Sequence, residues 1–310
     1  MPMSAINVDE SAVREDISAF IGDFTAETTP FSAAKIDNFQ NVLRPGTTVY
    51  VTFLPGTDYA DTVAVCRRLK DEGMRPVPHI AARSVPDRAF LEDNLKKFTD
   101  QAGIDEVLIV GGAVDRPIGE FSDSMQIMET GLLDKYGIKK IGVAGHPEGS
   151  PDITDEGIRE ALSWKNAFAE RSGAELYVVT QFCFEAEPII AWDKMIQAEG
   201  NKLPIRIGIP GLATIKTLLN YAKACGVGQS MNFLKRQASN ITKLMTVSTP
   251  DKQIVELARY RAQDINCGIT GVHMYPLGGI KKSAKWSYAV TDGHFDMNNK
   301  SNGFKVTIDL

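Results

Sequence analysis

Cysteine and aromatic residues are scarce in this sequence. Its four cysteines are spread over 310 residues without a Cys-x-x-Cys pair. That spacing argues against a disulfide framework and a cysteine-ligated zinc site, and it is typical of thiols in a reducing compartment. Aromatic residues make up 8% of the chain, and those in predicted helices are interpreted as packing residues.

Long apolar runs and an excess of positive charge are also missing. No run approaches the roughly 20 apolar residues needed to cross a bilayer, and the first 16 residues lack the apolar core of a secretory signal. The formal net charge is −5, which argues against a nucleic-acid surface because such surfaces are basic. We therefore expect a cytoplasmic protein without a membrane or nucleic-acid partner.

Several sequence motifs with well-defined chemistry are absent. There is no Gly-x-Gly-x-x-Gly after a predicted strand and no P-loop, so neither common phosphate-binding turn is predicted. There is no His-Glu-x-x-His, no His/Cys cluster and no Gly-x-Ser-x-Gly. We expect no metal site and no serine-hydrolase triad.

Short β-branched runs alternate with amphipathic stretches along most of the chain. The expected strands are Ile21–Glu27, Thr48–Phe53, Pro76–Ala82, Glu106–Gly112, Lys140–Gly145, Leu176–Phe182, Ile205–Pro210 and Gly271–Pro276. The later expected helices are Thr154–Ser172, Glu187–Glu199, Thr214–Cys225, Gln229–Lys243 and Thr249–Asn266.

Strands that alternate with helices indicate a parallel sheet, and eight such units are the number that closes a (β/α)8 TIM barrel. An open doubly wound sheet is the alternative. We expect one domain over residues 1–310, with an irregular tail from about residue 281 to 310, where the periodicity is lost.

Polar side chains gather where these strands end. They include Glu27, Thr52, His79, His146 and Gln181. In a barrel of this kind the reacting groups lie at the carboxyl ends of the strands. Polar residues also collect there for contact with solvent, so position alone leaves both readings open.

Taken together, these strand ends resemble the methylenetetrahydrofolate reductase family, in the order and spacing of its motifs, from about Phe24 to Leu277. The matching segments are Phe24–Pro30, Pro78–Ala81, Ala144–Pro151, Thr180–Glu185, Ile209–Gly211 and Gly271–Tyr275. The resemblance implies a (β/α)8 barrel that holds FAD at the strand ends and acts on a reduced folate by hydride transfer.

Within that resemblance, Glu27 corresponds to the family's general acid. Methylenetetrahydrofolate must open to an iminium before its methylene group accepts hydride, so N10 must gain a proton. A carboxylic acid can supply it if partial burial raises its pKa toward neutrality, and this is what we expect of Glu27.

The other implied contacts fall into two groups. Gln181 corresponds to a folate-binding glutamine, and Phe182 and Phe184 are placed near the pterin or in the core. The residues expected near FAD are Thr52, His79, Gly111, Gly112, Ala113, Ser122, His146, Lys165, Asn166 and Tyr275. For His79, Lys165, Asn166 and Tyr275 an ordinary structural role is the competing interpretation.

Two positions depart from the family pattern. Ala113 stands where the family has an aspartate near the flavin, with Asp115 as a candidate replacement. An arginine is missing after the last strand, where Lys281 or Lys282 could supply the charge. Loss of a carboxylate beside the flavin raises its potential, so physiological oxidation of 5-methyltetrahydrofolate is an alternative direction.

A flavin-free, folate-binding barrel is the alternative from another class, because a fold alone does not fix a function. The electron donor stays open among NADH, NADPH and a redox protein. Self-association into a homo-oligomer is expected only from the family resemblance.

Overall fold

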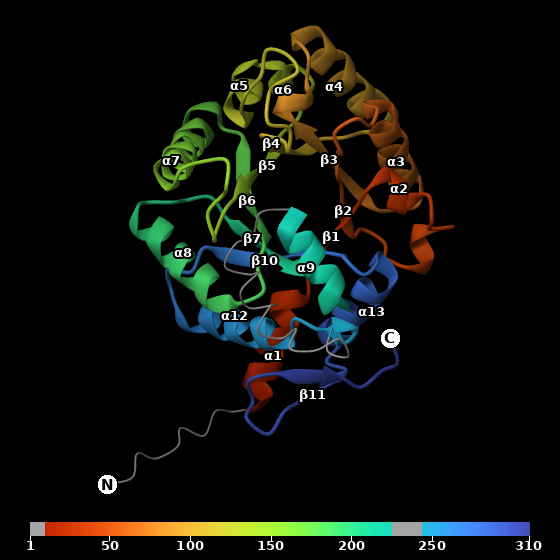
Figure 1. Ribbon diagram of the computed structural model, residues 1–310, viewed down its shortest axis with the longest axis vertical. Coiled ribbons are helices and arrows are strands. Elements are labelled where there is room, and N and C mark those ends of the chain that lie inside the picture. The colour runs from red at the N-terminus through yellow and green to blue at the C-terminus, as the bar shows by residue number, and fades with distance from the viewer. Residues whose placement is uncertain (1–9, 225–243) are drawn as a thin grey trace.

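The computed structural model describes residues 10–224 and 244–310. Eight parallel strands form a closed barrel in the order β1-β10-β7-β6-β5-β4-β3-β2, and helices surround it (Figure 1). The barrel strands are β1 (Thr25–Thr28), β2 (Thr48–Val51), β3 (Arg75–Ala81), β4 (Glu106–Val110), β5 (Lys140–Gly145), β6 (Glu175–Phe182), β7 (Ile205–Pro210) and β10 (Ile269–Tyr275). All eight predicted strands exist and the closed barrel is confirmed, so the open sheet is excluded. The first strand begins at Thr25 and not at Ile21, because Ile21 is the last residue of a helix.

With one exception, described below, the helices form the outer wall and bury their apolar faces against the strands. They are α1 (Glu10–Ile21), α2 (Pro30–Ala33), α3 (Tyr59–Asp71), α4 (Arg88–Ala102), α5 (Ser124–Glu129), α6 (Leu132–Lys135), α7 (Asp155–Ser172), α8 (Ala186–Ala198), α9 (Ile215–Ala224), α12 (Asp251–Gln263) and α13 (Ile280–Thr291). Short 3-10 turns lie at Phe39–Asn41 (η1) and Ala82–Ser84 (η2). Among the described residues no helix is both long and apolar enough to traverse a bilayer.

Several helices begin at side-chain caps. The Thr154 side chain accepts a hydrogen bond from the Gly157 amide at the start of α7, and Asp87 does the same for Phe90 at the start of α4. Gly173 ends α7 with φ of 70°, a backbone angle that glycine adopts without a steric penalty. These caps fix the length of each βα unit and thereby the position of the loops above the strands.

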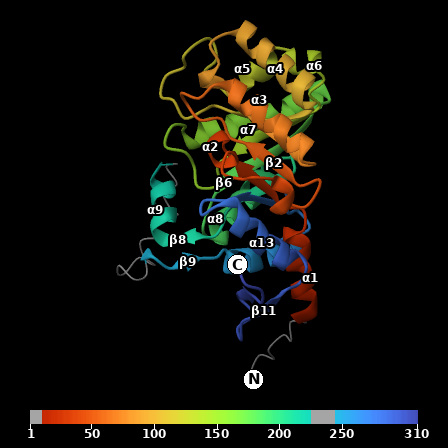
Figure 2. The same cartoon turned by 90° about the vertical axis from the view of Figure 1, so that its right-hand side faces the viewer.

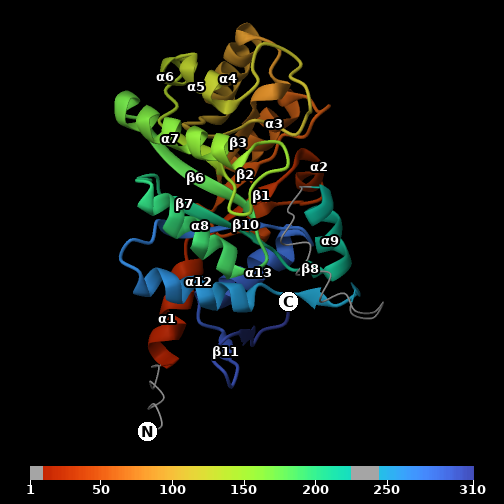
Figure 3. The same cartoon turned by 60° about the vertical axis from the view of Figure 1, so that its left-hand side comes forward.

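The last thirty residues differ from the expected irregular tail. Residues 280–291 form α13, whose Trp286, Ala289 and Val290 are buried, and the chain ends in a hairpin of β11 (Phe295–Met297) and β12 (Phe304–Val306). The helix was not predicted because its many polar residues mask an apolar stripe that follows a helical period. Figure 3 shows this hairpin below α12 and beside the N-terminal half of α1.

The carboxyl-terminal end of the barrel carries a small additional unit. β8 (Ala213–Thr214) pairs antiparallel with β9 (Val247–Ser248), and α9 follows β8. Figure 2 shows α9, β8 and β9 standing off the barrel on one side. The expected helix 229–243 lies outside the described residues.

Candidate active site

Glu27 lies at the carboxyl end of β1, and its side chain is almost fully buried. Thr52 follows β2, the parallel neighbour of β1, and its amide donates to the Thr28 carbonyl at 2.9 Å. The pairing of these strands places the Thr52 hydroxyl beside the carboxylate, where it donates a hydrogen bond to Glu27 Oε1. The sequence therefore fixes one oxygen of Glu27 by strand register alone.

Two imidazoles face the same carboxylate from opposite sides. His79 of β3 has Nε2 3.6 Å from Glu27 Oε1, and His273 of β10 has Nε2 3.6 Å from Glu27 Oε2. A hydrogen bond on the other side of the ring fixes His273, because its Nδ1 lies 2.8 Å from the Thr25 hydroxyl. Both Nε2 atoms are buried and have no hydrogen-bond partner among the described residues. At 3.6 Å these contacts are electrostatic, since the distance exceeds a normal hydrogen bond.

His273 is not among the site residues predicted from the sequence, although it lies in the matching segment Gly271–Tyr275. It reaches Glu27 because barrel closure pairs the first and last strands, with Thr25 opposite His273. Eight strand–helix units predict a closed barrel, and closure pairs the first strand with the last. The number of units in the sequence could therefore have indicated that His273 lies near Glu27.

The charge state of Glu27 differs from expectation. Burial acts to raise its pKa, but the facing His273 and His79 and the Thr52 hydroxyl outweigh burial, so the pKa lies below its usual value. The expected rise of this pKa toward neutrality is therefore wrong. Burial lowers the pKa of His79 to about 4, despite the opposing effect of Glu27.

A pair of tyrosines closes the barrel beneath these groups. The Tyr50 and Tyr177 hydroxyls lie 2.6 Å apart, and the Tyr50 ring contacts His273 edge-on with centroids 4.6 Å apart. Burial raises the pKa of both tyrosines. They are neutral packing groups that separate Glu27 from the charged lower end of the barrel.

The carboxyl-terminal end of the barrel, called the mouth below, holds a further group of predicted site residues on its β6 and β10 side. They are Gln181, Phe182, Phe184 and Tyr275. The Phe182 ring contacts Phe184 and Tyr275 edge-on, with centroids 5.6 Å and 5.4 Å apart. The Tyr275 hydroxyl donates to the Thr180 carbonyl at 2.9 Å. Gln181 is half-buried. Both phenylalanines are buried in a small apolar cluster with α9, so packing accounts for much of their surface.

Lys165 and His146 form a second polar group, on the β5 side. Lys165 is 6% exposed, although it comes from helix α7, and its Nζ lies 3.5 Å from the Ala144 carbonyl. Burial lowers its pKa to about 8, and Asp123 partly offsets this effect. Burial together with Lys165 lowers the pKa of His146 to about 4. The sequence placed these two residues near one ligand, and the structure brings them together.

Asn166 points elsewhere, although it is adjacent to Lys165. Its amide donates to Asn201 Oδ1 at 3.1 Å and accepts from the Lys202 amide at 2.8 Å. Asn201 and Lys202 precede β7, at the opposite end of the barrel. Successive residues of a helix point about 100° apart, so neighbours in sequence need not share a face.

The loop after β4 holds Gly111, Gly112 and Ala113 at the rim. The Gly111 carbonyl accepts from the Arg83 amide at 2.9 Å. Gly112 has φ of 99°, and a Cβ there would come within 3.3 Å of the Ala81 side chain. Ala113 is exposed, as are Asp115 and Ser122 farther along the loop.

Arg83 is a structural residue of this rim that the sequence did not single out. Its guanidinium donates to the Ser122 carbonyl at 3.0 Å and to the Val114 carbonyl at 3.3 Å. Lys281 and Lys282 are exposed on α13, and Lys281 lines an outer groove of about 390 Å³ with Lys285 and Asp292.

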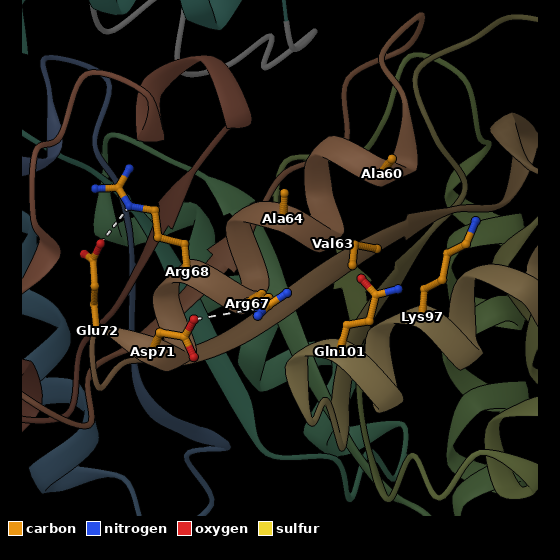
Figure 4. Close-up of a pocket in the computed structure, with 9 residues that line it drawn as sticks. All are labelled: Ala60, Val63, Ala64, Arg67, Arg68, Asp71, Glu72, Lys97 and Gln101. Carbon is orange, nitrogen blue, oxygen red and sulfur yellow. Dashed lines mark hydrogen bonds and ion pairs between the residues drawn. The ribbon is translucent and has the colours of Figure 1, made fainter.

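A larger groove of about 550 Å³ lies on the outer wall between α3 and α4 (Figure 4). Its polar lining is internally paired, since Arg68 bonds Glu72 at 2.7 Å and Arg67 lies 3.9 Å from Asp71. No strand-end side chain lines it, so it is separate from the polar mouth of the barrel.

Residues 28–285 match the family described as methylenetetrahydrofolate reductase. Methylenetetrahydrofolate reductase 1 of Schizosaccharomyces pombe (strain 972 / ATCC 24843) is 30% identical over 173 residues, or 53% of this chain and 26% of that protein. Methylenetetrahydrofolate reductase 2 of Saccharomyces cerevisiae (strain ATCC 204508 / S288c) is 24% identical over 165 residues, or 51% and 26%.

The matched region thus spans about a quarter of each yeast protein. A crystal structure of a dehydrogenase/reductase from Sinorhizobium meliloti 1021 covers 87% of this chain and 99% of its own, with a TM-score of 0.25 and 15% identity, which is too low to support an argument. The family match covers most of the barrel, including Thr52, His79 and His273. The chain belongs to the methylenetetrahydrofolate reductase family.

Proposed function

We propose that this protein is an FAD-dependent oxidoreductase that interconverts 5,10-methylenetetrahydrofolate and 5-methyltetrahydrofolate. The observation that carries the proposal, beside family membership, is the buried Glu27 carboxylate at the barrel mouth between Thr52, His79 and His273. Ring opening of the methylene substrate breaks a C–N10 bond and leaves the electron pair on N10. Glu27 is the group placed to supply the proton that N10 then takes up.

The chain also offers features that fit a bound FAD. The buried Lys165 ammonium has one long carbonyl contact, and a phosphate oxygen would satisfy it better. Gly112 lets the β4 loop turn close to η2, so its backbone can approach a ligand without a side chain intervening. We assign the diphosphate to Lys165 and the ring system to the rim formed by Thr52, His79, Gly111, Gly112, Ala113, His146 and Tyr275. Bound FAD would supply hydride transfer, with NADH, NADPH or a redox protein as electron donor.

The β6 side suits the folate. The half-buried Gln181 offers both a donor and an acceptor to a pterin edge, whereas Phe182 and Phe184 shape the apolar wall behind it. Ser122 is exposed at the start of α5, on the FAD side of the mouth.

The physiological direction has a second candidate. Ala113 places no carboxylate on the rim, and Asp115 is exposed two residues farther on. A rim without that charge favours a higher flavin potential and therefore oxidation of 5-methyltetrahydrofolate in one-carbon catabolism.

The test is the visible spectrum of the purified protein after incubation with FAD, followed by anaerobic addition of 5-methyltetrahydrofolate. We expect a bound-flavin spectrum that bleaches. Bound flavin that stays oxidised with this folate and with every electron donor offered would reject the reaction. A colourless protein that binds folate would favour the flavin-free, folate-binding alternative.

A further inference from the structure

The closure of the barrel creates a pairing between Glu27 and His273 that no single strand contains. His273 is fully buried, and its ring is fixed by the contact of Nδ1 with the Thr25 hydroxyl at 2.8 Å. The other ring nitrogen, Nε2, faces Glu27 Oε2 at 3.6 Å and has no hydrogen-bond partner among residues 10–224 and 244–310. A small shift of either side chain makes a direct hydrogen bond.

We propose that Glu27 and His273 act as one acid that holds a single shared proton, with Thr25 as the residue that orients His273 for this role. The inference rests on the proposed function, because it assigns the source of the proton that N10 receives. Thr25 suits both charge states, since its hydroxyl donates to a neutral Nδ1 and accepts from a protonated one.

The pairing explains how the site can supply a proton although Glu27 itself is ionised. A carboxyl group ordinarily titrates near about 4.3, and the pKa of Glu27 lies below its usual range. Glu27 alone would therefore carry almost no proton near neutral pH. When two groups are coupled, the steps in which they lose protons belong to the pair rather than to either residue.

The proton balance is simple. The loaded pair carries one proton, either on Glu27 or on His273 Nε2. When the C–N10 bond of the substrate breaks, N10 gains that proton and the pair is left as a carboxylate and a neutral imidazole. Solvent returns the proton after the folate leaves, and in the reverse reaction the pair accepts it.

Other titratable groups around His273 do not take this role. His79 faces Glu27 from β3, but its pKa of about 4 keeps it neutral near pH 7. Tyr50 from β2 and Tyr275 from β10 contact the His273 ring edge-on, with centroids 4.6 Å and 4.7 Å away. Farther down the barrel, Glu106 and Arg206 act on Tyr50.

The first experiment needs no activity. The chain has four histidines, so ¹⁵N-histidine labelling gives four imidazoles to follow by NMR as pH changes, and ¹³C-glutamate labelling reports Glu27. We expect Glu27 and His273 to shift in a common pH window in the ligand-free protein. Glu27→Gln should move the His273 titration, and His273→Gln should move that of Glu27. Independent titration in both variants would overturn the proposal.

The second experiment measures the pH dependence of folate-driven flavin reduction and reoxidation. His273→Gln keeps an N–H donor toward Glu27 but cannot carry the proton, so reoxidation by methylenetetrahydrofolate above neutral pH should fall roughly tenfold or more and recover at lower pH. Thr25→Val should give a smaller change of the same kind. Tyr50→Phe keeps the ring that packs against His273 but removes the hydroxyl that bonds Tyr177, and it should keep the wild-type pH profile.

The two proposals fail separately. A wild-type protein without any folate reaction would reject the proposed function, whereas the titrations would still decide whether the proton is shared. A His273→Gln profile with unchanged shape at every pH would assign His273 to packing and overturn the shared acid.

Discussion

Two sectors of the barrel mouth hold their polar groups in different ways. On the β1 side, Glu27 is surrounded by Thr52, His79 and His273, so the chain itself fixes the reacting group. On the β5 side, Lys165 is buried with one carbonyl at 3.5 Å, and no described carboxylate lies within ion-pair distance of its Nζ. The first sector is organised before a ligand arrives. The second leaves a buried charge without a described anionic partner, which is what the proposed function requires of an anion-binding group.

The largest effect is expected when the preorganised sector loses its acid. Glu27→Gln keeps the size of the side chain and an oxygen for the Thr52 hydroxyl but cannot donate a proton to N10. We expect the folate half-reaction to slow by about 10²–10⁴-fold, while FAD binding and flavin reduction by the electron donor are retained. Stopped-flow measurement of each half-reaction checks this. Equal slowing of both half-reactions would contradict a role confined to the folate step.

Substitutions of two adjacent residues on α7 test the sector on the β5 side. Lys165→Met removes the buried ammonium and should weaken FAD binding about tenfold or more, because a charge-assisted contact is lost. The same change should stabilise the ligand-free protein near pH 7. A pKa of about 8 in place of 10.5 corresponds to roughly 3 kcal/mol of unfavourable burial.

The sign of this stability effect has its own pH signature. The unfolded chain binds the Lys165 proton more tightly than the folded chain, so the wild-type penalty is complete below pH 8 and disappears as pH rises toward 10.5. Asn166→Ala is the matched control. It should leave FAD affinity unchanged and lower stability by about 1 kcal/mol, because its amide bonds Asn201 and Lys202. Fluorescence titration with FAD and denaturant unfolding of the apoprotein separate these outcomes.

The same two residues show what the sequence could and could not predict. Strand periodicity predicted all eight barrel strands. The family resemblance predicted that Glu27, Thr52 and His79 lie together at the carboxyl-terminal end of the barrel. The sequence did not show that Lys165 and Asn166 point in different directions, because the direction of each side chain depends on how α7 is rotated against the barrel. Nor could it give the direction of the Glu27 pKa shift, since His273 approaches only when the last strand pairs with the first. Local patterns predict elements, whereas electrostatics depends on contacts between distant parts of the chain.

His146 offers an intermediate effect on acid stability. Its pKa is about 4 in the folded chain and about 6.5 when unfolded, so the unfolded state binds more protons between these values. Wild-type stability should therefore fall as pH drops from 6.5 to 4. His146→Gln should remove this contribution, worth roughly 2 kcal/mol at pH 5. Urea unfolding at pH 7 and pH 5 measures it, and an equal difference between variant and wild type at both pH values would contradict it.

The smallest effect concerns the rim between the two sectors. Ala113→Asp places a carboxylate where the family has one, and its negative charge should disfavour the reduced flavin. Residue 113 is exposed, so solvent screens the charge. We expect the flavin potential to fall by on the order of 10–30 mV, up to about 1.4 kcal/mol for a two-electron couple.

Asp115→Asn is the companion change, because Asp115 is the nearby carboxylate that could replace the missing one. If it does, the Asn variant should raise the potential by a similar or smaller amount. Redox titration of both variants, with folate rates in both directions, tests this. A lower potential in Ala113→Asp should speed reduction of methylenetetrahydrofolate relative to the reverse reaction. Potentials unchanged in both variants would show that the rim charge does not set the direction, and the case for catabolic oxidation based on Ala113 would fail.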